Sequence, residues 1–160
     1  MGLLVALAGA FVVPKSPAAH AETPAQASET EASFYGQIQP LLGAGRYPEA
    51  ARLAERAMKL LDDAPDDSGH FPFLLGSTFT LYGDHARAEP IFVRLLGAQD
   101  PRAPNPAVYE SLGRIRLALG DVEGAAPLLQ RAIAIAEERF SRESPYAIGA
   151  LEALAALHRR

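Results

Sequence analysis

The chain has 160 residues, of which 49% are hydrophobic and 21% are charged, and its formal net charge is −4 at pH 7. This composition allows one domain with a buried core and a short appendage, and its mildly acidic balance argues against a nucleic-acid-binding protein. The absence of cysteine excludes disulfides, zinc–thiolate sites, thiol catalysis and a lipid-modified N-terminal cysteine. Abundant alanine and a preference for arginine over lysine fit a GC-rich bacterial genome.

Residues 3–13, LLVALAGAFVV, form an uncharged apolar run. The run is shorter than the roughly 20 residues of a membrane-spanning helix, and it has the length of a signal-peptide core. The small-x-small sequence AHA, which ends at Ala21, offers a cleavage site, although no lysine or arginine precedes the run. We predict that residues 1–21 are a signal peptide and that the protein is periplasmic or secreted. An uncleaved membrane tether and a buried N-terminal helix are the alternatives.

A flexible linker is predicted to follow, because residues 22–30, ETPAQASET, are small and polar and include a proline. The folded domain is expected over residues 31–160.

The centre of this domain repeats itself with an offset of 37 residues, so that Gly83-Asp84 recurs as Gly120-Asp121. The same offset relates Leu75-Gly76 to Leu112-Gly113, Ala88 to Ala125, Pro90 to Pro127, and Phe92 to Leu129. A proline inside a helix removes a backbone donor and crowds the preceding turn. Its recurrence in the same register therefore indicates an internal repeat.

Weaker copies lie on either side of these two. The upstream copy places Gly45, Tyr47, Ala50, Ala54 and Ala57 in the same slots, with an offset of 38 residues. Downstream, LEALAALH at residues 151–158 matches the start of a fourth copy, with an offset of 42 residues. The copies are predicted to start near residues 31, 69 and 106, and a partial copy near residue 148.

Each copy is predicted to form two helices around a tight turn. In the third copy, Tyr109, Leu112, Ile115 and Leu119 have helical spacing, and a second apolar face runs from Ala125 to Ala136. Gly120 is expected to end the first helix, and the Asp121 side chain to cap the second. Gly113 and Ala125 are small, which would let the two helices approach closely. Pro101, Pro104 and Pro106 suggest a longer connector before this copy.

The pattern resembles the tetratricopeptide repeat family, whose repeat reads W-x2-L-G-x2-Y, then A-x3-F, then a small residue and a proline. The second copy provides Leu75-Gly76, Phe79, Ala88 and Phe92. The third provides Tyr109, Leu112-Gly113, Ala125, Leu129 and Ala132. The first keeps Phe34, Leu41, Ala50 and Ala57 but has Gln37-Ile38 in place of Leu-Gly.

This resemblance implies an all-α fold, an α–α superhelix of about three helical hairpins plus a terminal helix. The long repeats are similar to those of kinesin light chains. The family's concave groove is lined by the first helix of each pair. Its groove positions fall here on Tyr35, Gln39, His70, Phe73, Ser77, Thr80, Glu110, Arg114 and Leu117, and further on Leu42, Glu152 and Arg159.

The function implied by the resemblance is that of a non-enzymatic adaptor which holds a peptide or partner helix in this groove. A membrane-tethered assembly factor and an accessory subunit of an envelope enzyme complex are the alternatives. Some family members hold a C-terminal carboxylate with a Lys and an Asn four residues apart, and no pair here matches, so chaperone tails are not predicted partners. The alanines and leucines of the last helix also allow a homodimer.

The histidines and acidic residues do not have the spacings of known metal-binding or catalytic motifs. No two of His20, His70, His85 and His158 are four residues apart, so no zinc site is predicted. Asp62, Asp63, Asp66 and Asp67 lack the spacing of a calcium loop, and Pro65 interrupts them. A nucleophile elbow and a phosphate-binding loop are also missing. The sequence therefore predicts neither an enzyme nor a cofactor, and no nucleic-acid partner.

Overall fold

The computed structural model describes residues 29–63, 69–141 and 143–157, and within them the regular structure consists of seven α-helices and no strand. The helices are α1 (Glu31–Gly43), α2 (Tyr47–Asp63), α3 (His70–Tyr82), α4 (His85–Ala98), α5 (Pro106–Leu119), α6 (Val122–Arg139) and α7 (Pro145–Leu157). The predicted signal peptide and most of the predicted linker lie outside the described residues. Among the helices described, none is long and apolar enough to cross a membrane.

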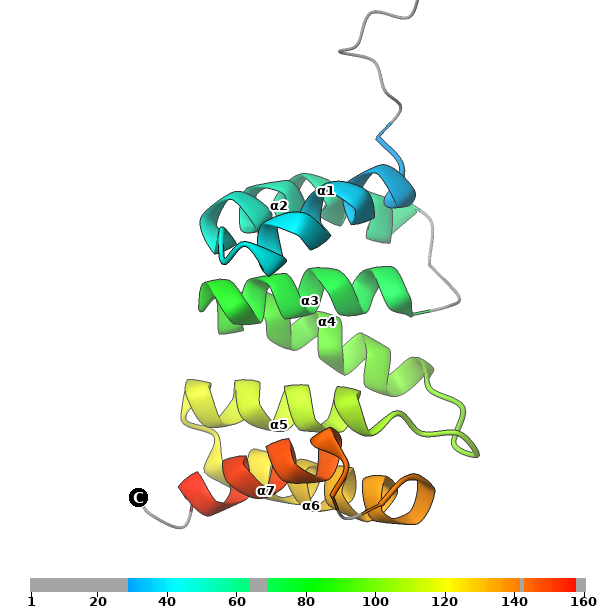
Figure 1. Cartoon of the computed structure of the whole chain (residues 1–160), viewed down its shortest axis with the longest axis vertical. Helices are drawn as coiled ribbons and strands as arrows, with labels where there is room; N and C mark the ends of the chain where they lie inside the picture. Colours follow the sequence, from blue (N-terminus) through cyan, green and yellow to red (C-terminus); the bar gives the residue numbers. More distant parts are fainter. Residues whose placement is uncertain (1–28, 64–68, 142, 158–160) are drawn as a thin grey trace, which may run out of the picture.

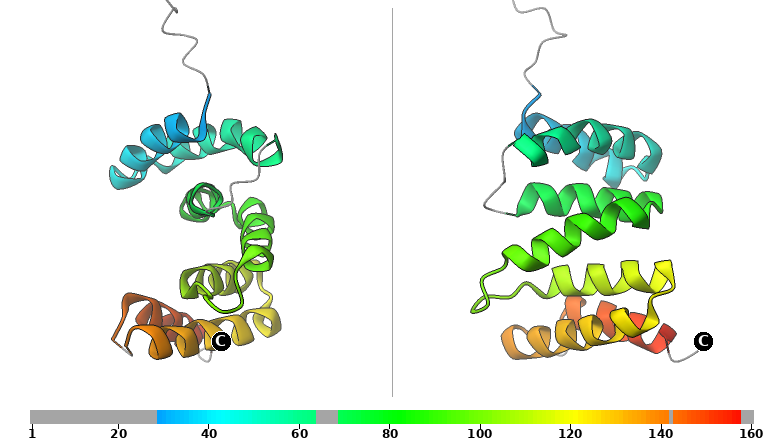
Figure 2. Two further views of the ribbon diagram at one scale, coloured as in Figure 1. Left: turned by 90° about the vertical axis from the view of Figure 1, so that its right-hand side faces the viewer. Right: turned by 180° about the vertical axis from the view of Figure 1, so that it is seen from behind.

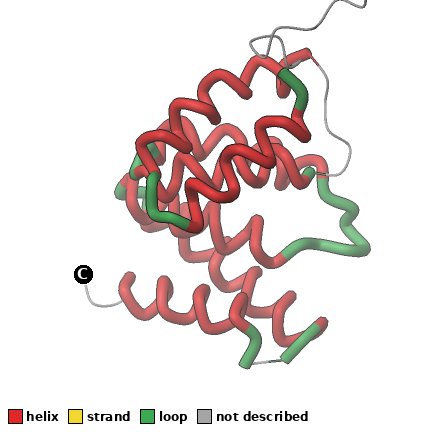
Figure 3. The backbone as a smooth tube through the Cα atoms, turned by 45° about the horizontal axis from the view of Figure 1, so that its top comes forward, coloured by secondary structure: helices red, strands yellow, loops and turns green. Residues whose placement is uncertain are grey.

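Consecutive helices pair into three antiparallel hairpins, α1–α2, α3–α4 and α5–α6, and α7 packs on α6 and α5 (Figure 1). The hairpins stack into a curved array whose odd-numbered helices lie along the inner side (Figure 2). The tight hairpin turns lie along one edge, and the longer connectors run along the opposite edge (Figures 1 and 3). This confirms the predicted all-α superhelix of three hairpins and a terminal helix.

The turns of the second and third hairpins are formed by the residues that the repeat predicts. Gly83 and Gly120 follow α3 and α5 with φ of 91° and 88°, a left-handed conformation that glycine adopts without strain. The next residue then caps the following helix, since the Asp84 carboxylate accepts from the Arg87 N–H and the Asp121 carboxylate from the Gly124 N–H. Each turn therefore ends one helix and starts the next within two residues.

The core forms two clusters, a larger one from α1 to α5 and a smaller one around α6 and α7, and consists of large apolar side chains set against alanines. The largest fully buried side chains include Phe34, Ile38, Leu75, Phe79, Phe92, Leu112, Ile115, Leu129 and Ile135. The alanines that face them from the second helices of the hairpins are fully buried at positions 50, 54, 57, 88, 125, 132 and 136. Leu119, which has helical spacing with Leu112 and Ile115, is 46% exposed, because it is the last residue of α5 and adjoins the turn.

Side-chain size is matched where the two helices of a hairpin meet. A methyl group added at Gly76 would lie 2.7 Å from Phe92 Cε2, and one added at Gly113 would lie 2.8 Å from Leu129 Cγ. In the first hairpin the equivalent slots hold Ile38 and Ala54, both fully buried. The large residue has moved from the second helix to the first, and this exchange explains why Gln37-Ile38 is compatible with the repeat.

The two prolines in register lie on the outer surface of the second helices. Pro90 in α4 and Pro127 in α6 are exposed. The helix carbonyls that lose their donor belong to Ala86 and Glu123, which are exposed as well. Water can satisfy these carbonyls, so the prolines cost less here than they would in a buried helix.

Substitution of Gly113 by alanine tests the size matching. The added methyl group would also lie 3.4 Å from the Ala125 carbonyl oxygen, so the helices must separate, and we expect a loss of about 1–3 kcal/mol in the free energy of unfolding. Gly97→Ala is the matched control, because Gly97 lies in α4 with nothing within 4 Å of the added group. Alanine there should stabilise the helix by about 0.5–1 kcal/mol. Urea unfolding followed by circular dichroism measures both, and equal stabilities would contradict the packing argument.

Candidate functional site

The nine predicted groove residues all lie on odd-numbered helices, which line the inner side of the curve (Figure 2). Those most accessible to a partner are Tyr35, Gln39, His70 and Arg114, while Phe73, Ser77, Thr80, Glu110 and Leu117 are half-buried. Glu152 on α7 is also exposed, and Arg159 lies outside the described residues. The nine groove residues are spread over α1, α3 and α5 and do not form a single cluster.

On α1, Tyr35 and Gln39 are one helical turn apart and form a polar pair at the surface. The Gln39 Nε2 donates to the Tyr35 hydroxyl at 3.2 Å, and Tyr35 is 42% exposed. Leu42, one turn further, is half-buried and packs against the core. The first helix therefore offers an aromatic ring and an amide on a rigid base.

On α3, some of the predicted groove residues are already engaged within the protein. Phe73 packs against the core and meets Phe92 edge to face, with 5.4 Å between ring centroids. The Thr80 hydroxyl donates to the Gly76 carbonyl at 2.8 Å, within its own helix. Phe73 therefore has one side in the core and the other at the surface, and Thr80 can offer a partner only its oxygen lone pairs.

On α5, Glu110 is held between Arg114 and the backbone of α7. Arg114 Nη1 lies 3.2 Å from Glu110 Oε1, and the Glu110 side chain is only 16% exposed. A methyl group at Gly149 would collide with this carboxylate, so the glycine provides the space that Glu110 occupies. Burial raises the pKa of Glu110, the neighbouring Glu152 adds to the rise, and Arg114 opposes it. The carboxylate is therefore under-solvated in the free protein.

Leu117 is mainly a packing residue. It lies against the cluster formed by Leu129, Ala132 and Ala150, where α5, α6 and α7 meet. Leu117 is assigned to the groove from the repeat register alone. Because three helices converge on this position, its side chain packs between them.

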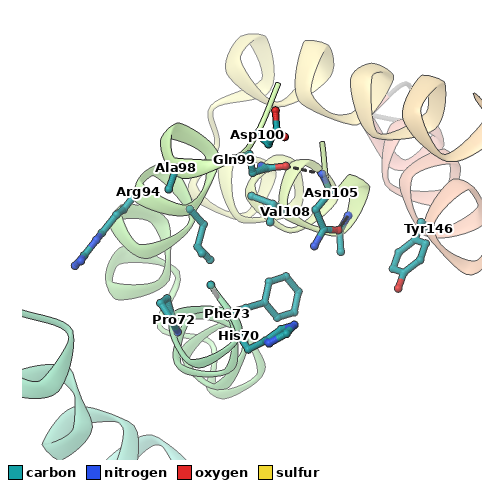
Figure 4. A pocket seen from close by; sticks show the side chains of 13 residues that line it. His70, Pro72, Phe73, Arg94, Ala98, Gln99, Asp100, Asn105, Val108 and Tyr146 are labelled. Atoms are coloured by element: carbon teal, nitrogen blue, oxygen red, sulfur yellow. Dashed lines mark hydrogen bonds between the residues drawn. The ribbon is translucent and has the colours of Figure 1, made fainter. Parts of the chain in front are cut away.

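A pocket of about 640 Å³ opens at the edge where the connectors run (Figure 4). His70 and Phe73 of α3, Leu95 of α4, Gln99 of the α4–α5 connector, Val108 of α5 and Tyr146 of α7 contribute to its wall. Of these, only His70 and Phe73 are predicted groove residues. The others depend on the path of the connector and on the position of α7, which the repeat pattern does not specify.

Acidic and metal-binding groups do not gather in the described part of the chain. No three His, Asp or Glu side chains there are placed to hold a metal ion. Residues 64–67 of the acidic stretch from Asp62 to Asp67 lie outside the described residues. Its interpretation as a solvated connector stays a prediction.

Comparison with known proteins agrees with this geometry. The sequence model of the tetratricopeptide repeat matches residues 108–143, which span α5, its turn and α6. A crystal structure of nearly identical TPR-like repeats, assigned to a kinesin light chain of Podosopora anserina, superimposes with a TM-score of 0.65 and 18% sequence identity. The similarity covers 89% of this chain and 69% of that one. No curated protein sequence matches the chain. Residues 108–143 therefore match one tetratricopeptide repeat, and the whole helical array has the fold of TPR-like repeats.

Proposed function

We propose that this protein is a non-enzymatic adaptor that binds an extended polypeptide or a partner helix along its inner surface. The observation that carries the proposal is the alignment of α1, α3, α5 and α7 on the inner side of the curve (Figure 2). Repeat solenoids use such extended surfaces to bind other chains. The exposed Tyr35, Gln39 and Arg114 along this side provide aromatic, amide and cationic contacts.

A peptide library displayed on phage and selected against the full chain tests this proposal. We expect enriched peptides whose dissociation constant rises about tenfold in a variant with both Tyr35→Ala and Arg114→Ala, since few interface residues carry most of the binding energy. The control variant combines Val93→Ala and Arg131→Ala, which remove exposed side chains from α4 and α6 on the even-numbered helices. Fluorescence anisotropy measures the binding. An equal loss of peptide affinity in the two variants would show that the peptides do not bind specifically to the inner surface.

The ionisation of Glu110 provides a second test of the inner surface. Because its pKa is raised in the folded state, the ionised carboxylate opposes folding at neutral pH, and this cost disappears as the pH falls through the folded pKa. Glu110→Gln should therefore be more stable than the parent at pH 7, and the difference should shrink towards acidic pH. A cationic side chain bound beside Glu110 would lower its pKa again.

Glu49→Gln is the control of opposite sign, because the hydrogen bond from Arg46 lowers the pKa of Glu49. The ionised Glu49 carboxylate stabilises the parent at neutral pH, and this stabilisation is lost as the pH falls through the folded pKa of Glu49. The Glu49→Gln variant should therefore be less stable than the parent at pH 7. Urea unfolding at several pH values measures both variants. If Glu110→Gln is less stable than the parent at pH 7, the effect of Arg114 on the pKa of Glu110 is larger than the effect of burial.

We also propose that the adaptor acts in the periplasm or outside the cell, on the strength of the apolar run at residues 3–13 and the AHA sequence before Glu22. Expression in a bacterium with a C-terminal tag, followed by N-terminal sequencing of the purified protein, should give a chain that starts at Glu22. A chain that retains Met1 and fractionates with membranes would instead support a tethered protein.

A further inference from the structure

The pocket beside the α4–α5 connector is large enough to hold part of a bound chain. Its volume of about 640 Å³ lies within the range of roughly 300–1,000 Å³ that small-ligand sites occupy. It opens between the start of α3, the end of α4 and the start of α5, and Tyr146 of α7 stands at its side (Figure 4). It adjoins the inner surface through His70 and Phe73, two of the predicted groove residues.

The inner wall of the pocket is apolar and uncharged. Pro72, Leu95 and Val108 are buried core residues that form part of it, and the half-buried ring of Phe73 lies beside them. Two charged residues lie at its margin. Arg94 donates to the Leu61 carbonyl at 3.0 Å, and its side chain extends away from the pocket (Figure 4). Asp100 accepts from the Arg102 N–H at 2.8 Å. A charged ligand group placed against Pro72, Leu95 and Val108 would lose its hydration beside side chains that carry no charge.

The connector that forms the polar side of the pocket is fixed by hydrogen bonds. Gln99 Oε1 accepts from the Asn105 N–H, and the Asn105 side chain in turn caps α5 by accepting from the Ala107 N–H. Arg139 of α6 donates to the Pro104 carbonyl at 2.8 Å. A pocket wall that is already ordered reduces the entropy lost on binding.

One buried donor at this wall is unsatisfied. Gln99 Nε2 is buried and has no hydrogen-bond partner among the described residues, while the other end of the same amide is bound to Asn105. A buried donor without an acceptor is destabilising, so an acceptor brought in by a ligand would be favoured. A backbone carbonyl is a neutral acceptor and suits this uncharged site.

We propose that the pocket binds a large uncharged aliphatic side chain of the partner polypeptide, and that a backbone carbonyl of the same segment accepts from Gln99 Nε2. The proposal rests on the polypeptide-binding function proposed above and names one contact within it. The side chain packs against Pro72, Leu95 and Val108, which explains the preference for an apolar residue. The carbonyl contact orients the bound segment along the connector.

Capped amino acids test the pocket separately from the rest of the inner surface. The probe is N-acetyl-leucine methylamide, titrated into the ¹⁵N-labelled full chain, with the alanine, lysine and glutamate analogues for comparison. The leucine probe should shift the amide signals of Phe73, Gln99 and Val108, with a dissociation constant about tenfold lower than that of any analogue. Equal binding of the lysine or glutamate probe would overturn the proposal.

Two variants refine the test. Ala98→Trp places a large ring at an exposed position of the pocket margin and should abolish leucine binding, whereas Ala118→Trp, at an exposed position of α5 that does not line the pocket, should leave it unchanged. Gln99→Glu keeps the acceptor for Asn105 but replaces the Nε2 donor, and should weaken leucine binding about tenfold. Circular dichroism confirms that each variant folds.

The results separate this proposal from the general function. Unchanged leucine binding in both Ala98→Trp and Gln99→Glu would overturn the pocket proposal, even if library peptides still bind the inner surface. Binding of the leucine probe without any library peptide would support the pocket and contradict the adaptor function.

Discussion

The close approach of the two helices in each hairpin is the constraint on which the rest of the structure depends. It requires a small residue on one helix opposite a large one on the other, because two large side chains at that point would force the backbones apart. The second and third hairpins place glycine on the first helix, opposite Phe92 and Leu129. The first hairpin reverses the sizes with Ile38 and Ala54. The buried alanines of the second helices serve the same close approach.

Much of the architecture could be predicted from the sequence because its determinants are local and recur at fixed offsets. In the second and third hairpins, a glycine follows the first helix and the next residue is the aspartate that caps the second helix, and both behave as the repeat predicts. The pocket could not be predicted in this way, because Gln99 and Tyr146 are brought to it by a connector and a terminal helix outside the repeat register. The role of Leu117 depends on α7 for the same reason.

The inner surface combines fixed and adaptable groups. Phe73 is held by its edge-to-face contact with Phe92, and the Thr80 hydroxyl is bound to its own helix. Glu110 occupies space left by Gly149 and is only partly hydrated. Tyr35 and Arg114 are more exposed and can reorient. Such a surface combines side chains already fixed by contacts within the protein with more exposed ones, and the fixed part limits the entropy lost on binding.

The stacking order also determines how the protein comes apart. Within the described chain, α2 reaches α4 through the Arg87–Glu55 ion pair and the hydrogen bond from Arg94 to the Leu61 carbonyl, but the first hairpin packs on no helix beyond α4. The middle helix α3, by contrast, contacts α1, α2, α4 and α5. Cohesion is therefore passed from neighbour to neighbour, and the first hairpin can detach without breaking any contact of α5 or α6. Amide hydrogen exchange should then be fastest at this end of the molecule and slowest in its middle, and the folded state would include a minor population in which only the later helices remain assembled.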